Sequence, residues 1–227
     1  MIESLVPGTV AVASSVDGAE DVELFEAERR LVEGAGATRH QEFATVRGCA
    51  RRALTMLGES PQAVLKGARG EPQWPPGIVG SMTHCTGYTA AVVARASDVR
   101  GIGIDAEPSG PMPDGALTIV ALASEQQQVV SLGSTAEICW DKLLFSAKES
   151  VFKCWYPATH IELGFRDAEV TFSPNWTNDC DGGRRGRFHV RLIRSAVTHL
   201  PTDFEGRWRV GDGFAMTAVV LPAVGGR

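Results

Sequence analysis

Hydrophobic residues recur at helical spacing in four segments of the chain. These segments predict helices over residues 21–33, 38–57, 124–132 and 140–155. In the second segment the apolar positions follow the i, i+3, i+4, i+7 order of a core-facing helix: Phe43, Val46, Ala50, Leu54 and Leu57. Gly58 ends this helix, and Pro157 ends the last one, because proline lacks the backbone donor that a helix needs. The spacing of Ser134 and Glu137 predicts a capping box before the last helix.

Apolar runs of strand length follow each group of helices. They predict strands over residues 78–84, 88–94 and 99–107, and later over 168–172, 187–193, 207–210 and 214–221. Gly211-Asp212-Gly213 predicts a hairpin turn, whereas the arginine-rich residues 182–187 predict a flexible, solvated hairpin loop. Residues 66–77 and 108–115, which are rich in glycine and proline, predict a loop and a junction. Helices followed by strands, twice over, predict an α+β fold of two similar halves, residues 1–107 and 108–227.

Composition narrows the class of protein further. The chain has 227 residues, of which 44% are hydrophobic and 22% charged, so it can form a sizeable core. Its net charge of −5 argues against a general nucleic-acid binder. Five cysteines without a CxxC pair favour reduced thiols in the cytosol over a disulfide framework or a zinc site. A signal peptide and an apolar stretch of membrane-spanning length are both lacking, so we expect a cytoplasmic protein.

Three acidic residues are candidates for a metal site. Asp105 and Glu107 lie on the third predicted strand, where side chains alternate between faces. They therefore share a face with Gly101 and Gly103, which are expected to leave open space beside them. Glu149, in the last predicted helix, brings a third carboxylate. Oxygen ligands suit Mg²⁺, which usually completes its shell with water and substrate phosphates, so a phosphate-bearing substrate is expected.

The same acids have a structural interpretation. Glu149 and Lys153 are i, i+4 neighbours, and on a solvated helix face they would form an ion pair worth about 0.2–0.5 kcal/mol. Asp105 and Glu107 would then be polar residues at the end of an edge strand. Two acids on a strand and a third on a helix nevertheless form the arrangement that a magnesium site needs.

Basic residues supply a candidate phosphate site. Arg39, Arg47 and Arg51 lie within about a third of a turn on the helix predicted over residues 38–57. Guanidinium groups bind phosphate through paired hydrogen bonds, although such arginines often lie on a solvated face. Lys66 follows in the glycine-rich loop, and His84 ends a predicted strand.

Together these segments resemble the 4′-phosphopantetheinyl transferases, in particular the monomeric class of two halves that includes the surfactin-type and enterobactin-type enzymes. The resemblance covers residues 24–172 and lies in four blocks, residues 39–51, 74–84, 103–108 and 145–153. The last block is similar to W-x-x-K-E-[A/S]-x-x-K, with Phe145 in place of the tryptophan. Where the surfactin-type enzymes carry Gly-Lys-Pro, this chain has Gly70-Glu71-Pro72.

The resemblance implies transfer of the phosphopantetheine arm of coenzyme A to a serine of an acyl or peptidyl carrier protein, with release of adenosine 3′,5′-bisphosphate. It implies two pseudo-symmetric α+β halves with coenzyme A between them. The implied Mg²⁺ ligands are Asp105, Glu107 and Glu149, and the implied catalytic residues are Asp105, Glu149 and Lys153. Lys153 would stabilise or protonate the departing phosphate, and either Glu149 or a water on the metal would take the serine proton. The residues implied for coenzyme A are Arg39, Arg47, Lys66, Thr83, His84 and Lys153.

Two other functions stay open at this point. One is a non-catalytic carrier-protein or nucleotide binder on the same fold, and the other is a different Mg²⁺-dependent phosphotransferase or hydrolase acting on a nucleotide. A complete set of acids and Lys153 speaks against a binder, which needs no metal site. We expect a monomer without nucleic-acid or membrane partners, whose carrier docks near the strand after Pro108 and the last helix.

Overall fold

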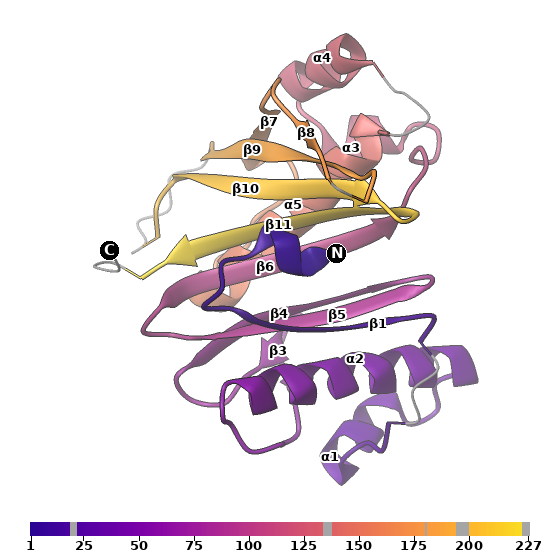
Figure 1. Ribbon diagram of the computed structural model, residues 1–227, viewed down its shortest axis with the longest axis vertical. Coiled ribbons are helices and arrows are strands. Elements are labelled where there is room, and N and C mark those ends of the chain that lie inside the picture. Colours follow the sequence, from indigo (N-terminus) through magenta and orange to yellow (C-terminus); the bar gives the residue numbers. More distant parts are fainter. Residues whose placement is uncertain (19–21, 134–137, 180, 194–199, 224–227) are drawn as a thin grey trace.

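The computed structural model describes residues 1–18, 22–133, 138–179, 181–193 and 200–223, and its strands form two main antiparallel sheets (Figure 1). The small sheet has the order β1 (Ala11–Val16), β5 (Tyr88–Arg95), β4 (Ile78–Cys85). The large sheet has the order β6 (Val99–Pro108), β11 (Phe214–Pro222), β10 (Asp203–Gly211), β9 (Arg184–Leu192), β7 (Ala168–Phe172), and β8 (Thr177–Asn178) also pairs with β9.

The sheets and the two long helices pack in four layers. Helix α2 (Ala37–Met56) covers the outer face of the small sheet, whose other face packs on β6 and β11 of the large sheet. Helix α5 (Trp140–Thr159) covers the opposite face of the large sheet. Strand β5 is buried on both faces, which explains its continuous apolar run. Two 20-residue helices, each on an antiparallel sheet, confirm the predicted α+β fold.

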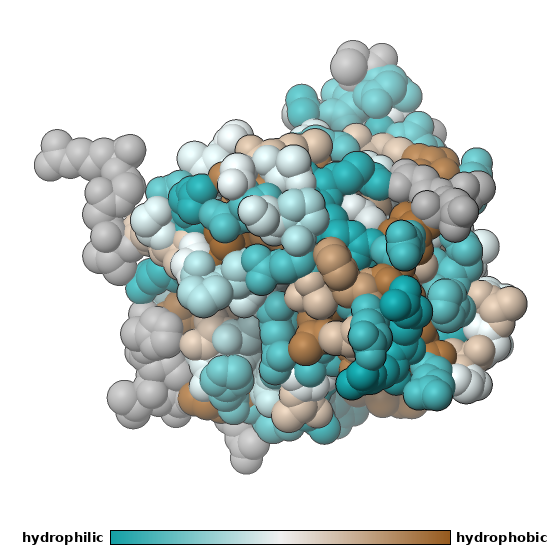
Figure 2. All heavy atoms as spheres, turned by 90° about the horizontal axis from the view of Figure 1, so that it is seen from below, coloured by the Kyte–Doolittle hydropathy of each residue, from teal (hydrophilic) through white to brown (hydrophobic). Residues whose placement is uncertain are grey.

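The first half begins with the short helix η1 (Ile2–Leu5) and strand β1. The helix predicted over residues 21–33 is shorter than expected, because α1 (Glu26–Arg29) starts where the Glu28 carboxylate accepts the Phe25 amide, and it tightens into η2 (Arg30–Val32). These segments cover α2, whose residues 43–50 are all buried. Its first turn is exposed. The face seen from below, on the side of α2, mixes hydrophilic and hydrophobic residues (Figure 2). The predicted loop 66–77 begins within the two-residue strand β2 (Leu65–Lys66) and contains the two-residue strand β3 (Pro72–Gln73).

The second half has the short helices α3 (Ala116–Val120) and α4 (Ala123–Leu132) before α5. The prediction that Pro157 ends α5 is wrong, because the helix runs on to Thr159. Proline in the last turn removes only one backbone bond, and the Thr159 hydroxyl donates to the Trp155 carbonyl there. The left-handed residue His160 ends the helix. The predicted capping box of Ser134 and Glu137 lies outside the described residues.

The C-terminal hairpin is confirmed in detail. Gly211 pairs with Phe214, and the two residues between them, Asp212 and Gly213, both have positive φ, as a tight primed turn requires. The arginines of residues 184–187 lie on β9 and not in the flexible loop that the sequence predicted. Cross-strand ion pairs, such as that of Arg187 with Glu205, fix them on the sheet.

Glycines on β6 bring α5 against the large sheet. Asp105, Gly103 and Gly101 do face the same side, but the prediction of open space beside them is wrong. A Cβ atom on Gly103 would lie 1.9 Å from the Ser150 carbonyl oxygen and 2.5 Å from the Cys154 nitrogen of α5. The missing side chain therefore lets the helix backbone approach the strand that carries Asp105.

Side chains join the two sheets where their edge strands, β4 and β6, meet. The Ile104 amide donates to the Ser81 hydroxyl at 3.1 Å, and the Ala106 amide donates to the Thr83 hydroxyl at 3.1 Å. Both hydroxyl residues are buried. They satisfy edge amides of β6 that no neighbouring strand pairs. The boundary predicted between residues 107 and 108 stays a prediction. Strand β6 runs across it to Pro108 and pairs with β11 of the second half.

Candidate functional site

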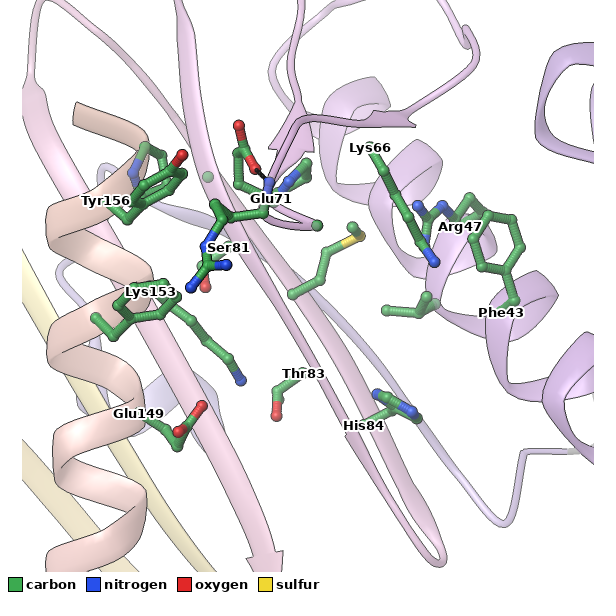
Figure 3. Close-up of a pocket in the computed structure, with 18 of the residues that line it drawn as sticks. Phe43, Arg47, Lys66, Glu71, Ser81, Thr83, His84, Glu149, Lys153 and Tyr156 are labelled. Atoms are coloured by element: carbon green, nitrogen blue, oxygen red, sulfur yellow. Dashed lines mark hydrogen bonds between the residues drawn. The ribbon is translucent and has the colours of Figure 1, made fainter. Parts of the chain in front are cut away.

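A hollow of about 320 Å³ lies between α2, the β2–β3 turn, β4 and α5 (Figure 3). It is lined from the first half by the predicted residues Arg39, Arg47, Lys66, Thr83 and His84. From α5, Glu149 and Lys153 point into it, across from the basic side chains. We call it the main hollow.

Arg47 forms the deepest part of the basic side. Only 3% of the residue is exposed, and its guanidinium lies 3.7 Å above the ring of Phe43. Its Nε donates to the Val64 carbonyl, but its buried Nη2 has no hydrogen-bond partner in the described part of the chain. Burial lowers the pKa of Arg47 to about 10, and the neighbouring Arg39 contributes to that shift. A buried cationic donor without an acceptor favours an anion in the hollow.

Lys66 and Arg39 add positive charge beside Arg47. Burial lowers the pKa of Lys66, and the repulsion from Arg39 and Arg47 lowers it further. Within the described ranges no carboxylate forms an ion pair with Lys66 or Arg47. Arg39 contacts Nε2 of His84 at 3.0 Å, and Glu42 lies near both. An arginine can only donate, so Nε2 of His84 accepts and the ring is neutral, in line with a pKa lowered by burial.

The acidic side centres on Asp105. It is 3% exposed, and its Oδ1 accepts the Lys153 ammonium at 2.7 Å and the Thr83 hydroxyl at 3.4 Å. Asp105 does not itself line the main hollow, but Lys153 and Thr83 do. Glu107, two residues along the strand, lies 3.6 Å from the Lys142 ammonium. Lys153 therefore links α5 to Asp105 on β6, and Lys142 links it to Glu107.

Burial raises the pKa values of the carboxyl groups of Glu107 and Glu149. For Glu149, burial is the main cause, Asp105 and Glu107 add to it, and Lys153 opposes it. For Glu107, burial again comes first and the Asp105 charge adds, while Lys142 opposes it. The three acids thus feel one another's charge, and a cation among them would relieve that repulsion.

Comparisons with known proteins identify the family. The 4′-phosphopantetheinyl transferase N-terminal domain matches residues 27–94, and the 4′-phosphopantetheinyl transferase superfamily matches residues 101–217. The chain is 45% identical to the 4′-phosphopantetheinyl transferase Svp of Streptomyces mobaraensis, over 100% of this chain and 91% of that protein. It is 41% identical to the 4′-phosphopantetheinyl transferase PptT of Mycobacterium tuberculosis, over 97% of this chain and 98% of the other.

The chain belongs to the 4′-phosphopantetheinyl transferase family. A more distant relative, enterobactin synthase component D of Salmonella typhi, is 29% identical over 74% of this chain and 77% of its own length. Members of the family transfer phosphopantetheine from coenzyme A to carrier proteins, so the chain is a transferase enzyme. Among its described residues, no helix is long and apolar enough to cross a membrane.

The acids of the transferase can be tested for their fit to a metal ion. In the described part of the chain, no three His, Cys, Asp or Glu side chains are already arranged to hold one. Lys153 contacts Asp105, and Lys142 contacts Glu107. Oδ2 of Asp105 is buried and has no hydrogen-bond partner in that part of the chain. An unpaired carboxylate oxygen beside acids with raised pKa values fits a hard divalent cation.

Two interpretations made from the sequence change. Arg51 does not line the main hollow with Arg39 and Arg47, because its guanidinium pairs at 2.8 Å with the fully buried Glu28. Lys153 contacts Asp105 and, within the described part of the chain, forms no ion pair with Glu149. The alternative of a solvated i, i+4 pair on α5 therefore does not describe this helix.

Lys148 does not line the main hollow, although its neighbour Glu149 does. Its ammonium is buried, pairs with Glu125 at 2.8 Å and donates to the carbonyls of Phe165 and Ala168. Burial lowers the pKa of Lys148, and the contact with Glu125 opposes that shift. Consecutive helix residues lie about 100° apart, so only Glu149 of the K-E motif reaches the main hollow.

The sequence did not single out several residues that shape the site. Phe152 and Tyr156 stack on each other on α5 and line the main hollow. Helical spacing from Glu149 and Lys153 was the signal that could have found them. The sequence did draw attention to Glu71, which replaces the lysine of the surfactin-type Gly-Lys-Pro triplet. Its side chain turns back over Gly67 and accepts the Arg69 amide at 2.9 Å. It thereby fixes the β2–β3 turn.

Proposed function

We propose that the main hollow binds the phosphates of coenzyme A and that Mg²⁺ binds beside it, between Asp105, Glu107 and Glu149. The observation that carries the proposal is Arg47, a buried guanidinium with an unpartnered nitrogen next to Lys66. Arg39 and His84 lie at the rim of the same basic side and would contact a further phosphate oxygen. Bound Mg²⁺ would supply charge neutralisation at the pyrophosphate.

The rest of the reaction follows from the side chains of the chain itself. The serine oxygen of the carrier forms a bond to the phosphorus that bears the pantetheine, and the phosphoanhydride bond breaks. Glu149 takes the serine proton, a role for which its raised pKa suits it. Lys153, now on Asp105, donates to the phosphate of the departing adenosine 3′,5′-bisphosphate.

A second hollow of about 270 Å³ would take the pantetheine arm. It shares Arg69, Glu149 and Phe152 with the main hollow and continues to residues 162–165. Its walls include the apolar side chains of Val151, Leu163 and Phe165. An arm leaving the pyrophosphate at Glu149 would enter it directly. We call it the arm hollow.

The partners we propose are acyl or peptidyl carrier domains, which a monomer would modify in the cytosol. The four described cysteines are free thiols, as expected for a reducing compartment. The acidic chain makes nucleic acid an unsuitable partner.

Intact-mass measurement tests the proposed function. Apo carrier proteins incubated with coenzyme A and Mg²⁺ should gain the mass of one phosphopantetheine group while adenosine 3′,5′-bisphosphate is released. A chelator should stop the reaction, and added Mg²⁺ should restore it. Release of the bisphosphate without any carrier would instead indicate a hydrolase, and binding without any release would indicate a non-catalytic binder.

A further inference from the structure

An ion pair connects the two halves of the transferase across the cleft that the main hollow and the arm hollow form together. Arg69, in the β2–β3 turn, and Glu162, just after α5, are 93 residues apart in the chain. Nε of Arg69 lies 2.9 Å from Oε1 of Glu162, and Nη2 lies 3.1 Å from Oε2. Two parallel contacts between a guanidinium and a carboxylate fix direction as well as distance.

The position of this pair is more informative than its strength. Arg69 lines both hollows, and Glu162 lines the arm hollow. The residues common to both hollows are Arg69, Glu149 and Phe152, so the pair lies where one hollow passes into the other, beside the carboxylate proposed as the base. About half or more of each side chain is exposed, which allows the pair to open and close.

Each end of the pair is held by its own half. On the Arg69 side, Glu71 accepts the Arg69 amide, and the Gly67 amide donates to the Glu71 carbonyl at 2.7 Å. On the Glu162 side, Lys148 binds the Phe165 carbonyl, and Asp167 accepts the Gly164 amide at 2.9 Å. Both side chains therefore start from fixed backbone, which lowers the entropic cost of pairing them.

We propose that Arg69 and Glu162 form a positioning bridge that closes over coenzyme A where its arm passes Glu149. This inference rests on the proposed function of the two hollows. The bridge fixes the width of the passage between the halves, and it retains the arm while the carrier serine approaches. Adenosine 3′,5′-bisphosphate, which has no arm, binds on the Arg47 side of the main hollow and leaves the passage to the arm hollow, where the bridge lies, empty.

Binding and kinetics of charge variants test the bridge. Arg69→Gln and Glu162→Gln should each raise the KM for coenzyme A about two- to five-fold, the range expected for an exposed ion pair, and leave kcat unchanged. The double variant should be no worse than either single variant. Arg69→Glu should be more harmful than Arg69→Gln, and Arg69→Glu with Glu162→Arg should return the KM to within about two-fold of wild type. At about 1 M salt, where charges are screened within about 3 Å, the differences should vanish.

Calorimetric titration supplies the decisive comparison. In the single variants and in the double glutamine variant, the dissociation constant for coenzyme A should rise, whereas the charge swap should restore it. In every variant, the dissociation constant for adenosine 3′,5′-bisphosphate should stay at the wild-type value. The exposed pair Arg187–Glu205 is a matched control, because its contact is 3.1 Å and it lies on neighbouring strands of one sheet. Arg187→Gln and Glu205→Gln should change neither constant.

Two outcomes would overturn the bridge. One is an equal loss of affinity for coenzyme A and the bisphosphate, and the other is wild-type affinity for both in the Arg69 and Glu162 variants. Failure of the proposed function would give a different result, because the wild-type protein itself would then leave apo carriers unmodified.

Discussion

Arg47 combines two properties that conflict unless an anion is present: its guanidinium is buried, and one of its nitrogens lacks a partner. We therefore expect Arg47→Ala to raise the KM for coenzyme A by about 10- to 100-fold, since a hydrogen bond to a charged group contributes about 1.5–3 kcal/mol. The contact exists before and during the reaction, so kcat should change little. Steady-state kinetics with varied coenzyme A measure both constants. A folded variant with an unchanged KM would refute the phosphate assignment.

Arg51 provides the matched control on the same helix. Its partner is Glu28, which is fully buried and also accepts the Val64 amide. Arg51→Ala should thus lower the free energy of unfolding without changing the KM for coenzyme A.

Glu149→Gln tests the acidic side. The substitution keeps the shape of the side chain and leaves the buried seam of α5 intact, so the variant should fold normally. Turnover should fall by about 10²-fold or more, the usual scale for the loss of a positioned acid–base group. Loss of a metal ligand would raise the Mg²⁺ concentration needed for half activity, whereas loss of a base would lower kcat at saturating Mg²⁺. Turnover within a few-fold of wild type would exclude both roles.

At the residue scale, the sequence predicted which side chains line the site better than it predicted which partners they contact. Arg39, Arg47, Thr83 and His84 were named from the similar blocks, Lys66 was named from the glycine-rich loop, and all five line the main hollow. Spacing on a helix cannot show that Arg51 turns to Glu28 or that Lys153 reaches Asp105, because both partners are far away in the sequence. The roles named for them in coenzyme A and metal binding stay predictions.

Helix α5 is an element with two anchors. One is its apolar seam, and the other is Lys148, which ties the helix to α4 through Glu125 and to the segment that leads into β7. We expect Lys148→Met to lower the free energy of unfolding by about 3–5 kcal/mol, because it leaves Glu125 buried and uncompensated. Adding Glu125→Gln should recover part of the loss, since an amide oxygen can still accept the Val170 amide that Glu125 binds. Urea denaturation of the single and double variants measures this, and a loss below about 1 kcal/mol would contradict it.

Helices and strands with a clear periodicity of hydrophobic residues were predictable, and those without one were not. The periodic helix predicted over residues 38–57 matches α2 closely, and β7 was predicted to the residue. Strand β1 was missed because its small and polar residues, Ala11–Val16, show no clear alternation. Pro157 was misjudged because a single missing bond in a last turn does not end a helix that its packing holds in place.

Carrier docking belongs to the scale of the whole molecule. The segment after Pro108 leads to helix α3 and not to the strand that we expected, and α3 exposes Ile119. Arg166 lies against it and donates to the Thr118 carbonyl at 2.7 Å. An acidic carrier should dock here through both apolar contact and charge. We expect its KM to rise with salt, and Arg166→Gln to flatten that dependence. A KM that stays constant across a salt series would remove the electrostatic part of this prediction.

The arrangement of the two halves could be predicted only in outline. The order of helices and strands indicated an α+β fold, since it depends on local patterns. The contact between β4 and β6 depends on the hydroxyls of Ser81 and Thr83, which resemble any other polar residue in a strand. Nothing in their immediate sequence shows that they will meet amides more than 20 residues away.

Those two hydroxyls also determine how the molecule can deform. A complete ladder of backbone hydrogen bonds between β4 and β6 would make the two sheets one continuous, stiff sheet and would fix the angle between them. A bond to a hydroxyl resists separation but tolerates rotation, because the donor reaches an oxygen on a short rotatable arm. The contact between the sheets is therefore more flexible than the sheets themselves. One of the two hydroxyl residues that form it, Thr83, also contacts Asp105. Any tilt of the halves around a ligand is thus transmitted to the acidic side of the cleft.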